Sequence, residues 1–128
     1  MSYEKLYEEA FKVLGDFPLA GSGFSAGSVA SALMTEQGNI FTGICIDVAC
    51  GLGFCAEHSA ISEMLKNRET RILEIIAISK DAVMPPCGRC REFIYQINSR
   101  NIETKVHLSK GKALLLDDLL PHRWNINA

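Results

Sequence analysis

The chain has 128 residues, of which 48% are hydrophobic and 22% charged, and its formal net charge is −2. This profile is typical of one folded domain and excludes a disordered chain, so we expect residues 1–128 to form a single domain. The slightly acidic balance, without clustered Lys and Arg, disfavours binding to bulk nucleic acid and favours a small-molecule substrate.

The first half of the chain has the pattern of a helix followed by a β-hairpin. Apolar residues at helical spacing predict an amphipathic helix over 3–14. Residues 29–35 and 40–46 read as two strands, and the stretch between them, 36–39, has the composition of a hairpin turn. We therefore expect the sheet to begin with an antiparallel pair.

The second half alternates between helix and strand. We expect a helix over 56–66, a buried β-branched strand over 71–79 and a second helix over 88–99. The remaining predicted elements are short: strands at 105–108 and 113–116, and a helical turn at 117–120. This order predicts an α/β fold in which helices sandwich a mixed sheet.

The first residues of the chain and its cysteines indicate the cellular compartment. The stretch Met1 to Lys5 lacks the features of a signal peptide, and no apolar run reaches the roughly 18 residues of a membrane span. We therefore expect a cytoplasmic protein that does not enter membranes. The odd number of cysteines argues against a disulfide framework and favours metal binding or catalysis. The five are Cys45, Cys50, Cys55, Cys87 and Cys90.

Two short motifs carry the chemistry, Cys55-Ala56-Glu57 and Pro86-Cys87-Gly88-Arg89-Cys90. Each begins a predicted helix, where free N–H groups and the helix dipole lower a thiol's pKa and favour the thiolate that zinc requires. Cys87 and Cys90 are three residues apart and can face one point. Three thiolates leave one tetrahedral position open for water, as in catalytic zinc sites.

Glu57 lies two residues after Cys55, close enough to act on water at such a metal without ligating it. A single carboxylate there can serve as general acid and base. The alternative is a structural zinc site whose fourth ligand comes from Cys45, Cys50 or His58. In that case the protein is a zinc-stabilised binding module without turnover.

At these motifs the sequence resembles the cytidine deaminase family, including its blasticidin S deaminase branch. Cys-x-Glu followed by Pro-Cys-x-x-Cys matches the signature of zinc nucleobase deaminases. The resemblance also covers the stretches 28–32, 38–43 and 119–121. It implies a three-layer α/β/α sandwich with a five-stranded mixed sheet. It further implies homotetramers whose active sites are completed by neighbouring subunits.

The resemblance implies hydrolytic deamination of a cytosine nucleoside, cytidine or deoxycytidine, to the uracil form with release of ammonia. One Zn²⁺ per subunit is then held by Cys55, Cys87 and Cys90, and Glu57 shuttles protons. A blasticidin S deaminase-type enzyme, acting on a cytosine nucleoside antibiotic or an enlarged cytosine derivative, is the alternative. Two departures from the family motivate this alternative. Gly27 replaces a pocket phenylalanine and suggests a roomier pocket, and Cys45-Ile46-Asp47 replaces the family's Asn-x-Glu.

Substrate contacts are also carried over from the family. Cys45-Ile46-Asp47 stands where cytidine deaminases have the Asn-x-Glu that grips the ribose hydroxyls. The positions assigned to the substrate pocket are Phe24, Ser28, Cys45, Asp47, Ala56 and Trp124.

Two of the functional positions have alternative roles. Trp124 is either a lid stacked on the base, often across a subunit boundary, or plain interface packing. His58 stands where many three-cysteine members carry an Arg that hydrogen-bonds the zinc thiolates. A protonated His58 would partly replace that Arg, and an exposed helix histidine is the alternative.

Overall fold

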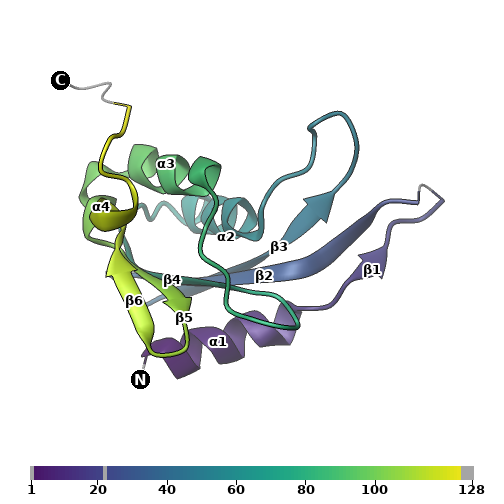
Figure 1. The fold of residues 1–128 in the computed structure, drawn as a ribbon, viewed down its shortest axis with the longest axis horizontal. Helices are drawn as coiled ribbons and strands as arrows, with labels where there is room; N and C mark the ends of the chain where they lie inside the picture. Colours follow the sequence, from purple (N-terminus) through teal and green to yellow (C-terminus); the bar gives the residue numbers. More distant parts are fainter. Residues whose placement is uncertain (1, 22, 125–128) are drawn as a thin grey trace.

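The computed structural model describes residues 2–21 and 23–124. Its elements are α1 (Ser2–Val13), β1 (Phe17–Pro18), β2 (Ser25–Thr35), β3 (Ile40–Asp47), α2 (Ala56–Lys66), β4 (Ile72–Ile78), α3 (Gly88–Ile97), a 3-10 helix η1 (Ser99–Glu103), β5 (Lys105–Ser109), β6 (Lys112–Leu115) and α4 (Leu116–Leu119). Figure 1 shows α1 on one face of the sheet and α2 and α3 on the other. The predicted three-layer α/β/α arrangement is confirmed.

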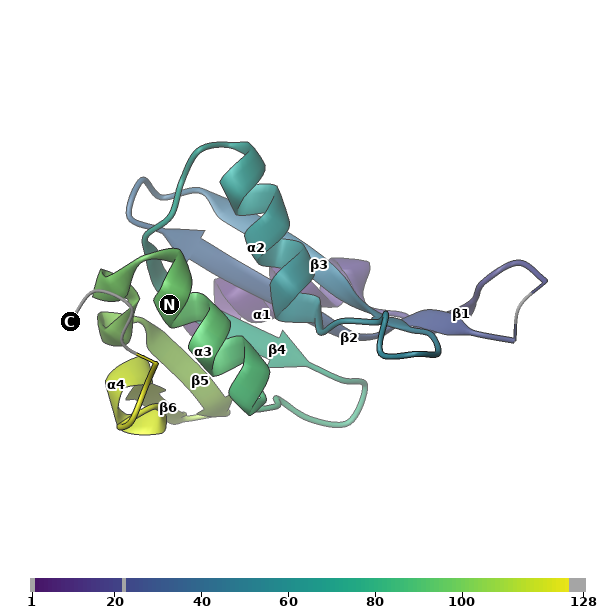
Figure 2. The same cartoon turned by 90° about the horizontal axis from the view of Figure 1, so that it is seen from above.

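The sheet is mixed, with the order β3-β2-β4-β5-β6. β2 pairs antiparallel with both β3 and β4, β4 pairs parallel with β5, and β5 pairs antiparallel with β6. β1 adds a sixth, two-residue strand beside the first residues of β2, on the side opposite β3. Together β1 and the start of β2 project from the body as an arm (Figures 1 and 2).

Alternating side chains divide the core between the two faces of the sheet. Ile75 of β4 packs with Ile61 of α2 and Ile94 of α3 in one buried cluster. Its neighbour Ile76 belongs to the second cluster, with Leu6 of α1. Strand β4, buried on both sides, therefore holds the helical layers together, as its β-branched sequence predicts.

Close packing of α2 on β3 depends on a glycine. A Cβ atom on Gly43 would lie 2.3 Å from the backbone nitrogen of Ala60 in α2. Residues 43, 45 and 47 share one face of β3 because side chains alternate along a strand. The face on which α2 rests therefore also presents Cys45 and Asp47.

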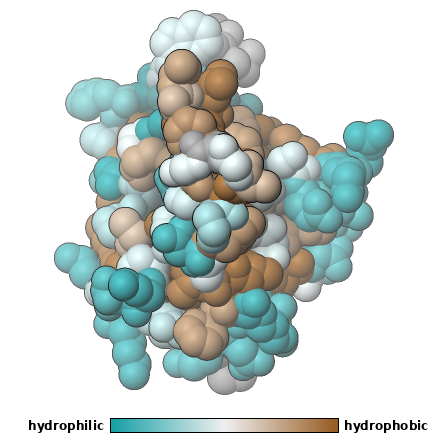
Figure 3. Space-filling view, turned by 90° about the vertical axis from the view of Figure 1, so that its right-hand side faces the viewer, coloured by the Kyte–Doolittle hydropathy of each residue, from teal (hydrophilic) through white to brown (hydrophobic). Residues whose placement is uncertain are grey.

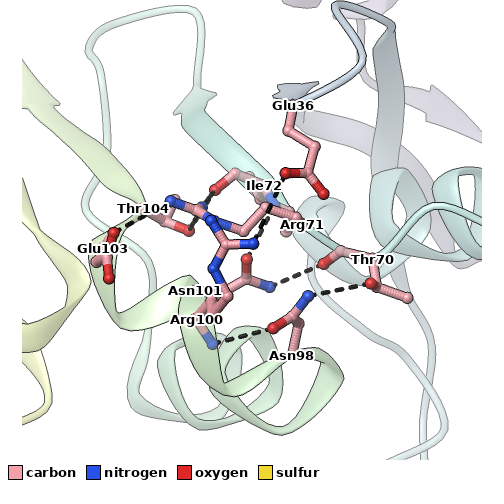
Figure 4. Close-up of polar contacts among 9 residues, drawn as sticks. All are labelled: Glu36, Thr70, Arg71, Ile72, Asn98, Arg100, Asn101, Glu103 and Thr104. Atoms are coloured by element: carbon pink, nitrogen blue, oxygen red, sulfur yellow. Dashed lines mark hydrogen bonds and ion pairs between the residues drawn. The ribbon is translucent and has the colours of Figure 1, made fainter.

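A buried polar cluster fixes the loops at the other end of the helices (Figure 4). Asn101 accepts a hydrogen bond from the Ile72 backbone nitrogen at 2.8 Å and donates to the Thr70 carbonyl at 3.0 Å. Thr104 donates to the Ile72 carbonyl at 2.7 Å. These bonds join the start of β4 to η1 and so hold the end of α3 against the sheet.

The start of β2 differs from the expectation. The strand begins at Ser25 rather than residue 29 because it passes through a bulge, where the register shifts between Ala26 and Ala30. Gly27 lies in this bulge with φ +90°, and a Cβ there would be 2.2 Å from the Gly15 carbonyl oxygen. Gly27 therefore serves a close backbone crossing, and it does not line the pocket described below.

Among the described residues, no helix combines the length and apolar character that crossing a membrane requires.

Candidate active site

The first thiol is placed by the end of β3. Ile46 and Phe54 form an antiparallel bridge in which each backbone N–H donates to the other's carbonyl, at 3.0 and 3.2 Å. This bridge returns the chain to the sheet immediately before Cys55, which is the N-cap residue of α2. Cys55 and Glu57 thus stand at the end of a helix that is anchored on β3.

The second pair of thiols is placed by α3. Cys87 is the N-cap residue of this helix, and Cys90 lies buried in its first turn. Arg91 donates to the Pro86 carbonyl at 2.8 Å and to the Leu119 carbonyl at 3.2 Å. The arginine therefore anchors the turn that presents Cys87.

The three sulfur atoms have the spacing of a zinc site. Cys55 Sγ lies 3.6 Å from Cys87 Sγ, which lies 3.7 Å from Cys90 Sγ, and all three are within 4.8 Å of one another. Tetrahedral zinc with Zn–S bonds near 2.3 Å requires sulfurs about 3.8 Å apart. The cluster therefore fits one Zn²⁺, and no fourth His, Cys, Asp or Glu among residues 2–21 and 23–124 belongs to it.

The thiols differ in acidity. Burial raises the pKa of Cys55 and of Cys90. Burial acts in the same direction on Cys87, but hydrogen bonds from the Cys90 backbone N–H and from the neighbouring thiols outweigh it and lower its pKa. The expectation that a helix N-terminus lowers every thiol pKa is correct for Cys87 only. A metal ion must therefore displace the protons of the other two thiols as it binds.

Glu57 is buried beside the cluster, with 4% of its surface exposed. Burial raises the pKa of its carboxyl because the charged form is poorly solvated there. A raised pKa brings a carboxyl closer to the range in which it exchanges protons with water and substrate. Its environment therefore suits a general acid and base.

His58 contacts the cluster on its helical side. Its Nδ1 lies 3.5 Å from Cys90 Sγ, and its ring stacks on Phe93 with centroids 4.2 Å apart and planes 3° from parallel. Burial, helped by the charge of Arg89, lowers the pKa of His58. The lowered pKa favours the neutral ring over the protonated form. That ring can supply one N–H to the Cys90 sulfur.

An open pocket of about 500 Å³ adjoins Cys55, Cys87 and Glu57. This volume lies in the range of about 300–1,000 Å³ that is usual for small-molecule sites. Much of the wall is apolar. The apolar side chains come from the sheet, from the loop after β3 and from the loop before α3: Val29, Ile46, Val48, Phe54, Ala56, Ala77, Met84 and Pro85.

Residues 2–105 match the family model of the cytidine and deoxycytidylate deaminase zinc-binding region. The chain belongs to this family. A cytidine deaminase of Histophilus somni is 33% identical over 109 residues, which are 78% of this chain and 31% of that protein. The chain spans between 31% and 46% of the length of the curated relatives it matches.

Solved structures of cytidine deaminases have the same fold. The enzyme from Mycobacterium leprae is 26% identical with a TM-score of 0.79, and the match covers 95% of this chain and 99% of that one. The enzyme from Burkholderia pseudomallei is also 26% identical, with a TM-score of 0.75 over 97% and 100% of the two chains.

Within this deaminase fold, four of the six positions expected to contact substrate meet in the pocket: Ser28, Cys45, Asp47 and Ala56. Phe24 and Trp124 are not among its lining residues. Phe24 lies on the projecting arm and is 39% exposed. Trp124 is 64% exposed, and its backbone N–H donates to Glu92 of α3 at 3.2 Å. Neither aromatic ring covers the pocket of its own chain.

The pocket also contains residues that the sequence argument did not assign to it. Met84 and Pro85 come from the loop before α3, and Arg89 comes from its first turn. The Pro-Pro pair before Cys87 could have indicated that the loop leading to the site is ordered. Met84 lies in an irregular loop, where hydrophobic periodicity carries no information.

Proposed function

We propose that this protein catalyses zinc-dependent hydrolytic deamination of a cytosine nucleoside, giving the uracil form and ammonia. The observation that carries the proposal is the combination of three thiols at zinc spacing with the buried carboxyl of Glu57. Cys55, Cys87 and Glu57 line one pocket of about 500 Å³. Family membership and the cytidine deaminase relatives support it. Residues 1–128 act in this proposal as one catalytic domain.

Cys55, Cys87 and Cys90 hold Zn²⁺ in this proposal, because their sulfurs are the only such cluster among the described residues. Bound zinc supplies Lewis acidity that lets water attack at neutral pH. The Glu57 carboxylate takes a proton from the attacking water and gives it to the ring nitrogen of the base. It then carries a second proton to the departing amino group, so that water and the amine are exchanged for a carbonyl and ammonia.

A substrate panel tests the proposal. Zinc-loaded protein is assayed by ultraviolet absorbance with cytidine, deoxycytidine, cytosine and blasticidin S. Glu57→Gln keeps the three thiols, so we expect full zinc content with a rate loss of several orders of magnitude. A binding module without turnover predicts no product from any substrate, and that result would reject the enzyme proposal.

A blasticidin S deaminase-type activity is the second candidate. Cys45 lines the pocket where cytidine deaminases carry an amide, and this departure favours a substrate other than cytidine. The argument from Gly27 no longer supports it, because the structure turns that position toward Gly15. Deamination of blasticidin S with a kcat/KM above that of cytidine would favour this candidate.

A homotetramer with shared active sites is also proposed. Exposed apolar side chains lie on the arm, at Phe17 and Phe24, and at Trp124. Figure 3, which views the molecule from the arm, shows apolar surface through the middle of this face with hydrophilic residues at its sides. Such a surface favours association with another subunit. Sedimentation of the wild type, Phe24→Ser and Trp124→Ser tests whether these rings hold the assembly together.

The proposed site of action is the cytoplasm, because all five cysteines are free and the proposed ligands must stay reduced. The proposed partner is a free nucleoside rather than nucleic acid, since the net charge is −2.

A further inference from the structure

A second hollow, the α1 hollow, lies between α1 and the turn that joins β5 to β6. It has two adjoining parts, which share Tyr3, Glu4 and Lys110. The part along α1 has a volume of about 550 Å³, and the part beside the turn has about 470 Å³. Figure 1 shows this turn beside the start of α1, on the face of the sheet opposite α2 and α3. No residue lines both this hollow and the active-site pocket, so the two are separate.

Three aromatic rings line the part of the hollow along α1. Tyr3, Tyr7 and Phe11 are four residues apart and therefore lie on one side of the helix. The Tyr3 and Tyr7 centroids are 6.0 Å apart, and those of Tyr7 and Phe11 are 6.2 Å apart with planes 12° from parallel. Phe11 is 61% exposed, although burying a phenylalanine ring is favourable. The two outer rings therefore offer a flat surface on which another aromatic ring can stack.

The inner end of this row of rings is fixed by the sheet. The ring of Tyr3 meets the ring of His107 edge-on, with centroids 5.3 Å apart and planes at 72°. His107 is buried, and its Nε2 lies 2.9 Å from Glu74 Oε1, which joins β5 to β4. Glu74 itself does not line the hollow. Tyr3 thus has a rigid support, and the paired carboxylate of Glu74 does not face a ligand there.

The part of the hollow beside the turn is basic. Lys105, Lys110 and Lys112 line it, and Glu4 is the single acidic residue among the described residues that do. Lys105 and Lys112 have no ion-pair partner among residues 2–21 and 23–124. An anion with several charges can therefore contact these ammonium groups without displacing an existing partner. The aromatic part instead contains the carboxylates of Glu4 and Glu8, which accept hydrogen bonds from hydroxyl or amino groups.

We propose that the α1 hollow is a second ligand site, which binds a nucleoside polyphosphate with its base stacked on Tyr7 and Phe11 and its phosphates among the three lysines. The aromatic and basic parts meet at Lys110, as the base and the phosphates of a nucleotide are joined through its sugar. A purely apolar ligand would leave the lysines without a partner, and an inorganic anion would leave the rings exposed. None of these residues takes part in the proposed deamination, so the inference does not rest on that reaction.

Calorimetric titration of the zinc-loaded protein tests the inference. The ligands are UTP, ATP, uridine, adenosine and tripolyphosphate, none of which contains the cytosine that the proposed reaction consumes. We expect each nucleotide to bind at least about tenfold more tightly than its nucleoside or tripolyphosphate, because each fragment reaches only one part of the site. Absence of nucleotide binding, or tripolyphosphate binding as tight as that of UTP, would overturn the proposal.

Variants locate the bound nucleotide. Lys112→Ala removes a charged donor and should weaken UTP binding by about tenfold. Lys66→Ala is the matched control, because Lys66 is exposed on α2 and does not line the hollow. Phe11→Ser should weaken binding by about fivefold or more, whereas Phe11→Tyr keeps a ring and should bind as the wild type does. Unchanged UTP affinity in Lys112→Ala and Phe11→Ser would place the nucleotide elsewhere and refute the assignment.

Two other occupants give different results. Single-stranded nucleic acid also combines bases with phosphates, although the net charge of −2 disfavours it. A thymidine oligonucleotide that binds tenfold more tightly than UTP would overturn the proposal in favour of that polymer. A smaller assembly of Phe11→Ser in sedimentation without nucleotide would instead assign this face to contact with a second copy of the chain.

Discussion

Replacing Gly43 with alanine would test how far the site depends on the packing of α2. The added Cβ would lie 2.3 Å from the Ala60 backbone nitrogen and 2.5 Å from Ser59 Cβ. No side-chain rotation relieves either contact, because both atoms are fixed to the α2 backbone. Overpacking a core costs about 1–3 kcal/mol. Since backbone must move here, we expect the free energy of unfolding to fall by about 3 kcal/mol, at the upper end of that range.

Moving α2 also displaces Cys55 and Glu57, so Gly43→Ala should bind zinc more weakly and turn over more slowly. Urea denaturation of chelator-treated protein gives the stability, and competition with a chromogenic chelator gives the zinc affinity. Gly88→Ala is the control, because a Cβ there meets no atom within 4 Å. A loss below about 0.5 kcal/mol for Gly43→Ala, the size of an ordinary surface change, would refute the packing argument.

Three further predictions concern the site. Cys90→Ser should bind well below one equivalent of zinc, measured by atomic absorption. Cys50→Ser lies outside the cluster and should still bind one equivalent. Equal zinc contents in the two variants would contradict the ligand assignment. His58→Phe preserves an aromatic ring but removes the N–H near Cys90, and should weaken zinc binding by about tenfold to a hundredfold; unchanged affinity in chelator competition would exclude that hydrogen bond. The last prediction concerns chelator-treated protein. Because the pKa of Glu57 is raised, the folded state holds this proton more tightly than the unfolded chain does. The free energy of unfolding should therefore fall as the pH rises above about 4.5. Glu57→Gln should flatten this slope in urea titrations, and parallel profiles for the two proteins would contradict it.

The helices that carry the chemistry were predictable because their signals are local. Apolar spacing and the preceding Cys55 give the bounds of α2 as 56–66, which the structure confirms. For α3 the same reasoning gives the correct start at Gly88 but an end two residues too late. The chain leaves the helix at Asn98, whose side chain accepts the Arg100 N–H and begins η1. Such a cap competes with the helix in a way that apolar spacing does not reveal.

The arm was not predictable, because its features depend on contacts distant in sequence. The strand pattern of β2 is interrupted at Gly27 and Ser28. Backbone pairing with Phe17 and with β3 nevertheless extends the strand to Ser25. Pro18 lacks a backbone N–H and weakens any strand signal for β1. The sequence alone suggests extra pocket space at Gly27, whereas its φ of +90° and the closeness of the Gly15 carbonyl oxygen assign it to the backbone crossing.

The two halves of the pocket differ in how tightly the fold constrains them. The thiols stand at the N-termini of α2 and α3, and their spacing follows from helices that the core fixes in place. Ser28 and Asp47 lie exposed where β2 and β3 leave the core, so other side chains could replace them there without disturbing its packing. Sequence motifs therefore indicate the reaction more directly than the substrate.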